Sequence, residues 1–261
     1  MRDTARHAIA VTCAAAALGA ATPAAAQQQF MDPEFNAQWG LAAIGAQYAL
    51  ERGITGAGVG VVVVDSIFQA THPEFAGRIY PFEFDPGDHS PSAHGTHVAG
   101  IIGAARNGDG MEGVAPDALL ASIYSLGTNA EVAAGYMGAL TAGLRIFNNS
   151  WGLTDEVDIT TITRAEAQDI AGVPLLNAFR SAVNASSVIV FATGNETLDN
   201  PDVFAGLPVY FPELRSGWIT VTSVDKNLTR SSFANACGAT AGLVHRGSRR
   251  QHLLDRANQH L

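Results

Sequence analysis

The feature that most constrains the fold is a run of apolar, mostly β-branched residues from Val59 to Val64. A strand with one solvated face alternates apolar and polar residues, whereas this run is continuous and predicts a strand buried on both faces. Strands of that kind are typical of parallel sheets covered by helices. The run ends at Asp65, which places a carboxylate at the edge of the sheet where open α/β proteins bind ligands.

The rest of the chain alternates between strand and helix signals, which predicts an α/β fold with a doubly wound parallel sheet and helices on both faces. The glycines Gly56, Gly58 and Gly60 precede the first strand instead of following it, which argues against a dinucleotide site. A further helix begins near His94, where apolar residues recur at spacings of three and four. The other predicted strands are 118–124, 145–149, 188–192 and 217–224, and the other predicted helices are 39–52, 131–144 and 173–183.

The beginning of the chain has the pattern of an export signal. Arg2 and Arg6 precede an apolar stretch over 8–21, and three small residues at 24–26 form a cleavage site. We therefore expect a signal peptide over residues 1–26 and a mature protein in the periplasm, at the cell surface or secreted. An alanine-rich helix of the mature chain is the alternative.

Composition limits the domain count and the partners. A chain of 261 residues is long enough for one large domain, and its formal net charge of −9 argues against nucleic acid and anionic membranes as partners. No stretch after the signal is apolar enough for a membrane span. We expect a polar linker over residues 27–38 before the main domain.

Three polar residues at the ends of predicted elements suit acyl transfer. An aspartate such as Asp65 can orient an imidazole, and His94 can then take a proton from a serine hydroxyl and pass it to the leaving amine. The side-chain amide of Asn195 can donate a hydrogen bond to the oxyanion of the tetrahedral intermediate. The order Asp then His along the chain is the one found in subtilisin.

Several motifs make the chain resemble the subtilisin-like serine peptidases, the subtilases. The resemblance covers about residues 39–238, from which we expect a partial subtilisin-like peptidase domain over 39–242. Within the family, segments 207–214 and 233–238 look most like the autotransporter serine peptidases of Gram-negative bacteria. The matching motifs are Val61-Val62-Val63-Val64-Asp65-Ser66, His94-Gly95-Thr96-His97-Val98-Ala99-Gly100, Gly113-Val114-Ala115-Pro116, Asn149-Ser150-Trp151-Gly152 and Ala192-Thr193-Gly194-Asn195.

The resemblance implies roles for individual residues. It implies that Asp65 and His94 are charge-relay residues, that Asn195 is the oxyanion donor, and that Ser150-Trp151-Gly152 lies along the main chain of a polypeptide substrate. The chain departs from the family at Ile67, where a glycine is usual.

No metal or cofactor is expected. The loop 107–110 lies where some members of the family bind calcium, but it has few oxygen ligands, and a solvated turn is the preferred interpretation. A metal site at His94 and His97 has suitable spacing but no evident third ligand. The oligomeric state is left open.

The family's serine motif, Gly-Thr-Ser-Met-Ala-x-Pro, does not occur in the 261 residues. We expect the peptidase domain to be C-terminally incomplete at about residue 242. The tail over 243–261 contains four arginines and three histidines from Val244 onward and is unlike the family, as after a frameshift or truncation; a basic partner-binding tail is the alternative. Two functions follow: a secreted serine endopeptidase by lineage, or an inactive remnant that at most binds peptides.

Overall fold

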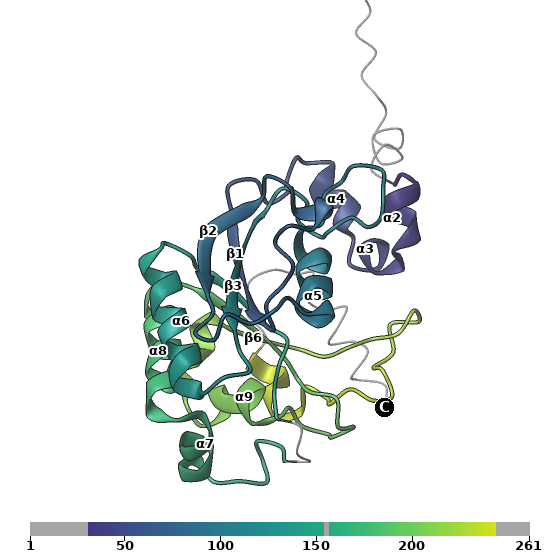
Figure 1. The fold of residues 1–261 in the computed structure, drawn as a ribbon. Coiled ribbons are helices and arrows are strands. Elements are labelled where there is room, and N and C mark those ends of the chain that lie inside the picture. The colour runs from purple at the N-terminus through teal and green to yellow at the C-terminus, as the bar shows by residue number, and fades with distance from the viewer. Residues whose placement is uncertain (1–30, 154–156, 244–261) are drawn as a thin grey trace, which may run out of the picture.

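The computed structural model describes residues 31–153 and 157–243, which form a six-stranded parallel sheet with helices on both sides (Figure 1). The strand order is β2-β3-β1-β4-β5-β6. The predicted strands are confirmed to within a few residues. The strands are β1 (Gly60–Asp65), β2 (Ile79–Phe84), β3 (Leu119–Tyr124), β4 (Ile146–Asn149), β5 (Val188–Ala192) and β6 (Trp218–Val221).

Strand β2 is absent from the sequence-based prediction. It contains Pro81, which cannot donate a hydrogen bond to a neighbouring strand, and no residue of β2 is fully buried. Both properties fit its position at the edge of the sheet beside β3.

The helix that begins near His94 and those predicted at 131–144 and 173–183 are confirmed with shifted ends, whereas α2, α7 and α9 were not predicted. None of the helices in the described part of the chain is long and apolar enough to cross a membrane. The helices are α2 (Pro33–Ala37), α3 (Trp39–Ala43), α4 (Ala46–Leu50), α5 (Ala93–Gly103), α6 (Asn129–Thr141), α7 (Arg164–Ala171), α8 (Val173–Asn184) and α9 (Val203–Gly206), with 3₁₀ turns at Pro73–Phe75, Leu207–Val209, Pro212–Gly217 and Gly238–Leu243.

One helix predicted over 39–52 is two short helices, α3 and α4, because Gly45 adopts a left-handed conformation at φ 73° and interrupts the helix. The segment expected as a polar linker also contains helix α2. Asp32 caps α2, and Phe35 is fully buried beside Leu41 and Leu50. Residues 32–38 therefore pack against the helices that follow them.

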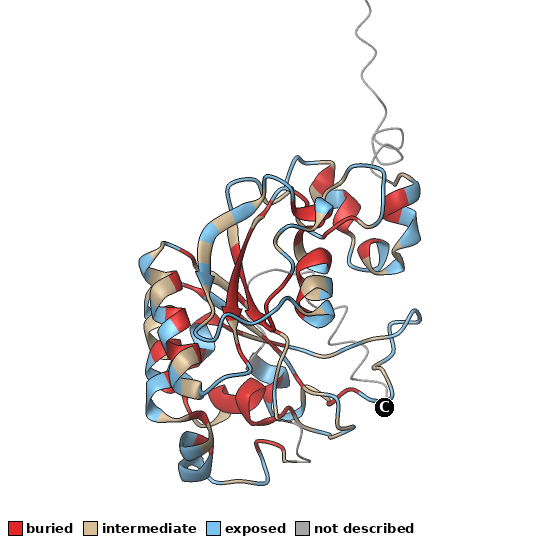
Figure 2. Ribbon diagram, viewed as in Figure 1, coloured by how far each residue is buried: buried red, intermediate tan, exposed pale blue. Residues whose placement is uncertain are grey.

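The two faces of the sheet are covered unequally. Helices α6 and α8 lie side by side over one face, where Phe147, Phe179, Phe191 and Trp218 belong to the main core. Helix α5 covers the other face at β1 and β3 only, where Val63 is buried. Figure 2 shows the buried centre of the sheet and the exposed outer sides of the helices.

Strand β5 is buried on one face only. Ile189 and Phe191 point into the main core, whereas Val188 and Ala192 on the opposite face are exposed. On the neighbouring strand β6, Val221 is also exposed. Helix α5, which packs on this side of the sheet, makes its main sheet contacts with β1 and β3.

Substitutions on the two faces of β5 should differ sharply in cost. Phe191→Ala removes a fully buried ring and should lower the free energy of unfolding by about 3–5 kcal/mol. Val188→Ala, three residues earlier on the exposed face, should cost less than about 1 kcal/mol. Urea unfolding followed by circular dichroism measures both, and similar losses for the two variants would contradict one-sided burial.

Candidate functional site

The site is organised around Asp65, the last residue of the central strand β1. The side chain is almost fully buried. Its Oδ1 accepts hydrogen bonds from the backbone N–H of Ser66 at 2.7 Å and from Ser66 Oγ at 2.9 Å. The same oxygen lies 2.7 Å from Nδ1 of His94. A distance this short is typical of a charge-assisted hydrogen bond, in which the ring N–H donates to a carboxylate oxygen.

His94 lies in the first turn of α5, and Ser92 caps that helix by accepting the His94 N–H at 3.2 Å. The imidazole side chain is 65% exposed although its partner carboxylate is buried. With Nδ1 directed at Asp65, the other ring nitrogen, Nε2, is left for a molecule arriving from solvent. This is the arrangement that a general base requires.

The close approach of α5 to the end of β1 depends on Gly95. A Cβ added at this position would lie 2.0 Å from the carbonyl oxygen of Ser66, so a side chain there would push the helix away. The Gly95 N–H instead donates to Ser66 Oγ at 3.1 Å. Ile67, where the resemblance to the family leads us to expect a glycine, is buried, and its carbonyl accepts the Ser92 N–H. The turn after β1 therefore tolerates isoleucine.

Asn195 lies three residues after β5, at the same carboxyl edge of the sheet as Asp65. The side chain is exposed, and its backbone N–H donates to Glu196 Oε2 at 2.7 Å. Strand β4 separates β1 from β5, so the two residues stand on next-but-one strands, roughly 10 Å apart at the usual strand spacing. The structure thus brings Asp65 and His94 into contact and places Asn195 along the same edge.

Asn235 holds the turn that carries Asn195, and sequence reasoning assigned it no role of its own. It is fully buried. Its Oδ1 accepts the N–H groups of Glu196 and Leu198, both at 2.9 Å, and its Nδ2 donates to Glu196 Oε2 and to the Thr193 carbonyl. No local pattern marks such a residue, because its partners lie about 40 positions earlier in the chain.

Ser150, Trp151 and Gly152 follow β4 in a segment without helix or strand structure. The Trp151 ring packs against Phe191 and Phe204 with centroids 5.2 and 4.7 Å apart, and its Nε1 donates to Asn149 Oδ1. The segment therefore has an aromatic wall that is fixed by packing and by a hydrogen bond.

Asp202 fixes the far end of this segment. Its carboxylate accepts the N–H groups of Leu153 at 3.0 Å and Ala205 at 2.8 Å, and a Cβ at Gly152 would lie 2.0 Å from it. Burial raises the pKa of Asp202 from its ordinary value of 3.8 to about 7, against the lowering effect of those hydrogen bonds. Asp202 is a second positioning residue that the sequence did not reveal.

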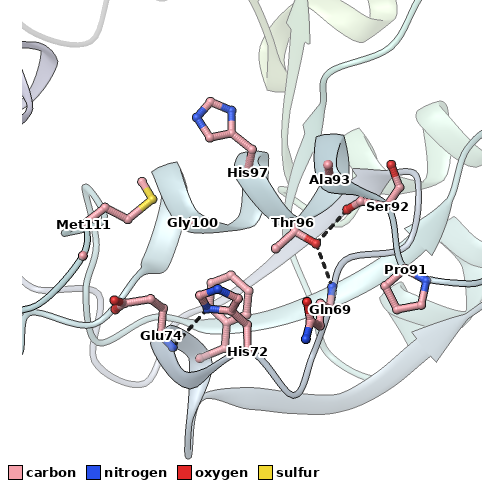
Figure 3. Close-up of a pocket in the computed structure, with 12 residues that line it drawn as sticks. Gln69, His72, Glu74, Pro91, Ser92, Ala93, Thr96, His97, Gly100 and Met111 are labelled. Atoms are coloured by element: carbon pink, nitrogen blue, oxygen red, sulfur yellow. Dashed lines mark hydrogen bonds between the residues drawn. The ribbon is translucent and has the colours of Figure 1, made fainter.

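An open hollow of about 660 Å³ lies beside α5 (Figure 3). It is lined by His97, His72, Glu74 and Met111 among others, but by none of Asp65, His94 or Asn195. The strand edge, rather than this hollow, therefore holds the acid–base pair. His97 lines the hollow while His94 contacts Asp65, so these two histidines do not form a shared ligand set with a third His, Cys, Asp or Glu among the described residues.

Comparisons with known proteins identify the family and the fold of the chain. A sequence model of the Peptidase_S8 family, described as the subtilase family, matches residues 56–258. The match therefore includes part of the tail beyond residue 242. The chain is 32% identical over 257 residues to a protein named "Extracellular serine protease" of Serratia marcescens, covering 81% of this chain and 24% of that protein. It is 30% identical to subtilisin BL of Lederbergia lenta, covering 75% of this chain and 66% of the relative.

Two solved structures share the fold. "Structure of Prenylagaramide maturation protease PagA" matches with a TM-score of 0.58 at 23% identity, covering 75% of this chain and 64% of that chain. "Crystal structure of MycP1 with the N-terminal propeptide removed" matches with a TM-score of 0.54 at 26% identity, covering 76% of this chain and 66% of that chain. The predicted α/β class is confirmed. The chain spans about a quarter of the length of the first curated relatives.

Gly95→Ala should separate α5 from the end of β1. Overpacking against the Ser66 carbonyl should lower the free energy of unfolding by about 1–3 kcal/mol and shift the NMR signals of the His94 ring. Gly40→Ala in α3 is the matched control, because nothing lies within 4 Å of the added methyl group. That variant should be as stable as the parent or slightly more so. Unchanged His94 signals in Gly95→Ala would contradict this role of the glycine.

Asp202 should make stability depend on pH. The native protein retains a proton on Asp202 that the unfolded chain releases above its ordinary pKa, so this residue's contribution to stability falls as pH rises from about 4 to 7. The slope is at most about 1.4 kcal/mol per pH unit. Asp202→Asn should lack that slope, and urea unfolding between pH 4 and 7 measures it. If the free energies of unfolding of parent and variant change with pH by the same amount, Asp202 does not titrate in this range.

Proposed function

The chain belongs to the subtilase family, and from this we propose that it derives from a serine-type endopeptidase in which Asp65 and His94 form the charge-relay pair. The observation that carries the proposal is the 2.7 Å contact between Asp65 Oδ1 and His94 Nδ1 at the carboxyl edge of the central strand. The buried carboxylate fixes the imidazole, and the exposed ring leaves Nε2 accessible.

In the proposed reaction, each group has one task. Nε2 of His94 takes the proton of a serine hydroxyl while its oxygen bonds to the carbonyl carbon of a peptide, and the carbonyl oxygen becomes the oxyanion. The Asn195 amide donates a hydrogen bond to that oxyanion. His94 then returns the proton to the leaving amine as the peptide C–N bond breaks, and Asp65 stabilises the imidazolium in between.

We propose that the substrate is a polypeptide that lies extended along Ser150-Trp151-Gly152. Backbone groups of an extended peptide can pair with a free segment of this kind as an added strand. Trp151, held between Phe191 and Phe204, supplies the wall of a side-chain pocket. The interaction of Asp202 with Leu153 supports a fixed position for this wall.

The proposed reaction also needs a nucleophilic serine. The family's Gly-Thr-Ser-Met-Ala-x-Pro motif does not occur in residues 1–261. Ser231 lies just before a turn with its Oγ 2.8 Å from Ser223 Oγ, which does not suit a nucleophile poised beside His94. The exposed face of β5 and β6, with Val188 and Val221, is consistent with a further helix that packs there. We therefore propose that these 261 residues alone bind peptides without hydrolysing them.

Export is part of the same proposal. Relatives are named extracellular proteases, including one from Serratia marcescens. The basic and apolar pattern of residues 1–26, which lie outside the described part of the chain, supports a signal peptide before the domain at 39–242. The tail assigned to 243–261 lies mostly outside the described residues, and its origin stays a proposal.

The activity of the 261-residue chain distinguishes the two functions. A fluorophosphonate probe bonds covalently to activated serines, and we expect no labelling of this chain. In subtilisin, loss of the serine lowers kcat about 2 × 10⁶-fold, so peptide hydrolysis should be at background. Gel fluorescence after incubation with the probe makes the measurement.

The matched control is His94→Ala, with circular dichroism of both proteins to verify folding. Labelling of the parent chain that His94→Ala abolishes would establish an active serine among the 261 residues and overturn the proposal of an inactive chain. Labelling that persists in His94→Ala would instead indicate a reaction unrelated to the Asp65–His94 pair.

A further inference from the structure

Asn107 and Gly108 form the only Asn–Gly dipeptide in the 261 residues. They lie in the loop after α5, and both are exposed to solvent. An asparagine followed by glycine is open to attack on its side-chain amide by the next backbone nitrogen, because glycine has no Cβ to obstruct the approach. At Gly108 nothing lies within 4 Å of the place that a Cβ would take. The dipeptide is therefore sterically free to close into a five-membered succinimide ring.

A carboxylate accepts the backbone proton that this ring closure has to remove. The Gly108 N–H donates to Glu34 Oε2 at 2.7 Å, a length typical of a charge-assisted hydrogen bond. Glu34 lies in the first turn of α2 and is almost fully buried. Its other oxygen, Oε1, is buried and has no hydrogen-bond partner among the described residues. A carboxylate whose short hydrogen bond comes from the proton that must leave is positioned as a general base.

The side-chain amide of Asn107 is held at both of its polar atoms. Oδ1 accepts the Asp109 N–H at 2.9 Å, and Nδ2 donates to Glu74 Oε2 at 3.4 Å. The first contact places a donor where negative charge develops when the amide carbon is attacked, as in an oxyanion hole. The second contact holds the leaving nitrogen on the other side. Helix α2, the 3₁₀ turn Pro73–Phe75 and the loop itself therefore converge on one dipeptide.

We propose that Asn107-Gly108 is a self-modifying site at which Glu34 acts as the general base for deamidation. The nitrogen of Gly108 bonds to Cγ of Asn107 while its proton passes to Glu34 Oε2. The amide oxygen takes up negative charge beside the Asp109 N–H. The Cγ–Nδ2 bond then breaks, the proton returns from Glu34 through water to the departing nitrogen, and ammonia leaves. The products of this step are a succinimide and ammonia.

Water completes the reaction by adding to one of the two carbonyl groups of the succinimide. Opening at one carbonyl gives aspartate at position 107, and opening at the other gives isoaspartate, in which the main chain runs through the side-chain carbon. The overall change replaces an amide by a carboxyl group and consumes one water, without an oxidant or a reductant. Position 107 therefore gains a negative charge in either product.

The new charge weakens the contact between α2 and the loop after α5. Glu34 and Glu74 both contact the dipeptide, so a carboxylate at position 107 is repelled from two sides. In isoaspartate the extra main-chain atom also displaces the Gly108 N–H from Glu34. The ion pair between Arg106 and Asp32 at 3.0 Å is not changed, so the chain should keep its fold at reduced stability.

Two other exposed asparagines are controls within the same chain. Asn184 is followed by Ala185 and Asn227 by Leu228, and both following residues have a Cβ. The backbone N–H groups of Ala185 and Leu228 donate to main-chain carbonyls instead of a carboxylate. Both asparagines should therefore stay intact while the Asn–Gly dipeptide reacts. No residue of the Asp65–His94 pair takes part, so the inference stands or falls independently of the proposed function.

Mass spectrometry of the full chain follows the reaction. The folded chain is kept at neutral pH, samples are digested with trypsin at intervals, and the peptide that begins at Asn107, after cleavage at Arg106, is weighed. We expect this peptide to convert to the deamidated form while Asn184 and Asn227 stay unchanged. Isoaspartate in the product is detected by enzymatic methylation. In urea, where the contact with Glu34 is lost, the parent should react at least about 10-fold more slowly.

Glu34→Gln tests the base. Glutamine keeps the shape of the side chain but cannot take the proton, so the folded variant should deamidate at least about 10-fold more slowly than the folded parent. In urea the two rates should be equal. Glu51→Gln, at the end of α4, is the matched control and should react like the parent. Asn107→Asp reproduces one product, and its thermal unfolding midpoint should lie about 2–4 °C below that of the parent.

Any of four results would overturn the site. These are an intact Asn107 in the aged parent, equal rates in folded parent and folded Glu34→Gln, an equally slow reaction in Glu51→Gln, and a parent that reacts faster in urea than in the folded state. If Glu34→Gln does not fold, the comparison of folded and unfolded parent still decides. An Asn107→Asp midpoint equal to that of the parent would overturn the loss of stability.

Discussion

The candidate site depends on the close contact between the first turn of α5 and the end of β1. The helix can approach because Gly95 has no side chain to meet the Ser66 carbonyl, and three hydrogen bonds then hold the two segments together. They run from Gly95 to Ser66 Oγ, from Ser92 to the Ile67 carbonyl, and from Gln69 to Thr96 Oγ1. Figure 3 shows Thr96 in this role. Only with the helix held there can a largely exposed imidazole lie 2.7 Å from a buried carboxylate.

The rest of the site is fixed by buried polar residues that take no part in the proposed chemistry. Asn235 satisfies four groups in the turn around Asn195, and Asp202 holds the backbone beyond Gly152. Since an unpaired polar group in the interior is costly, each of these networks favours one conformation of its loop. The parallel strands bring the loops to one edge, and the buried side chains set their detailed shape.

Helices of the described residues cover the two faces of the sheet to different extents. One face has a continuous aromatic core under α6 and α8, whereas the other is covered by α5 at β1 and β3 and is open at β5 and β6. The exposed side chains on that face, Val188, Ala192 and Val221, leave room for further apolar surface to pack there.

The amino-acid sequence by itself determined the alternation of strands and helices, the strand that ends at Asp65, and the helix that opens at His94, because apolar periodicity and element ends are local properties. It could not determine that α3 and α4 are separate, that Val188 is exposed, or that β2 is a strand. Those depend on one glycine conformation, on which helices reach which strands, and on pairing at the sheet edge. The roles of Asn235 and Asp202 came from the tertiary structure alone, because Asn235 holds Glu196 and Leu198 and Asp202 holds Leu153, all of them tens of positions away in the chain.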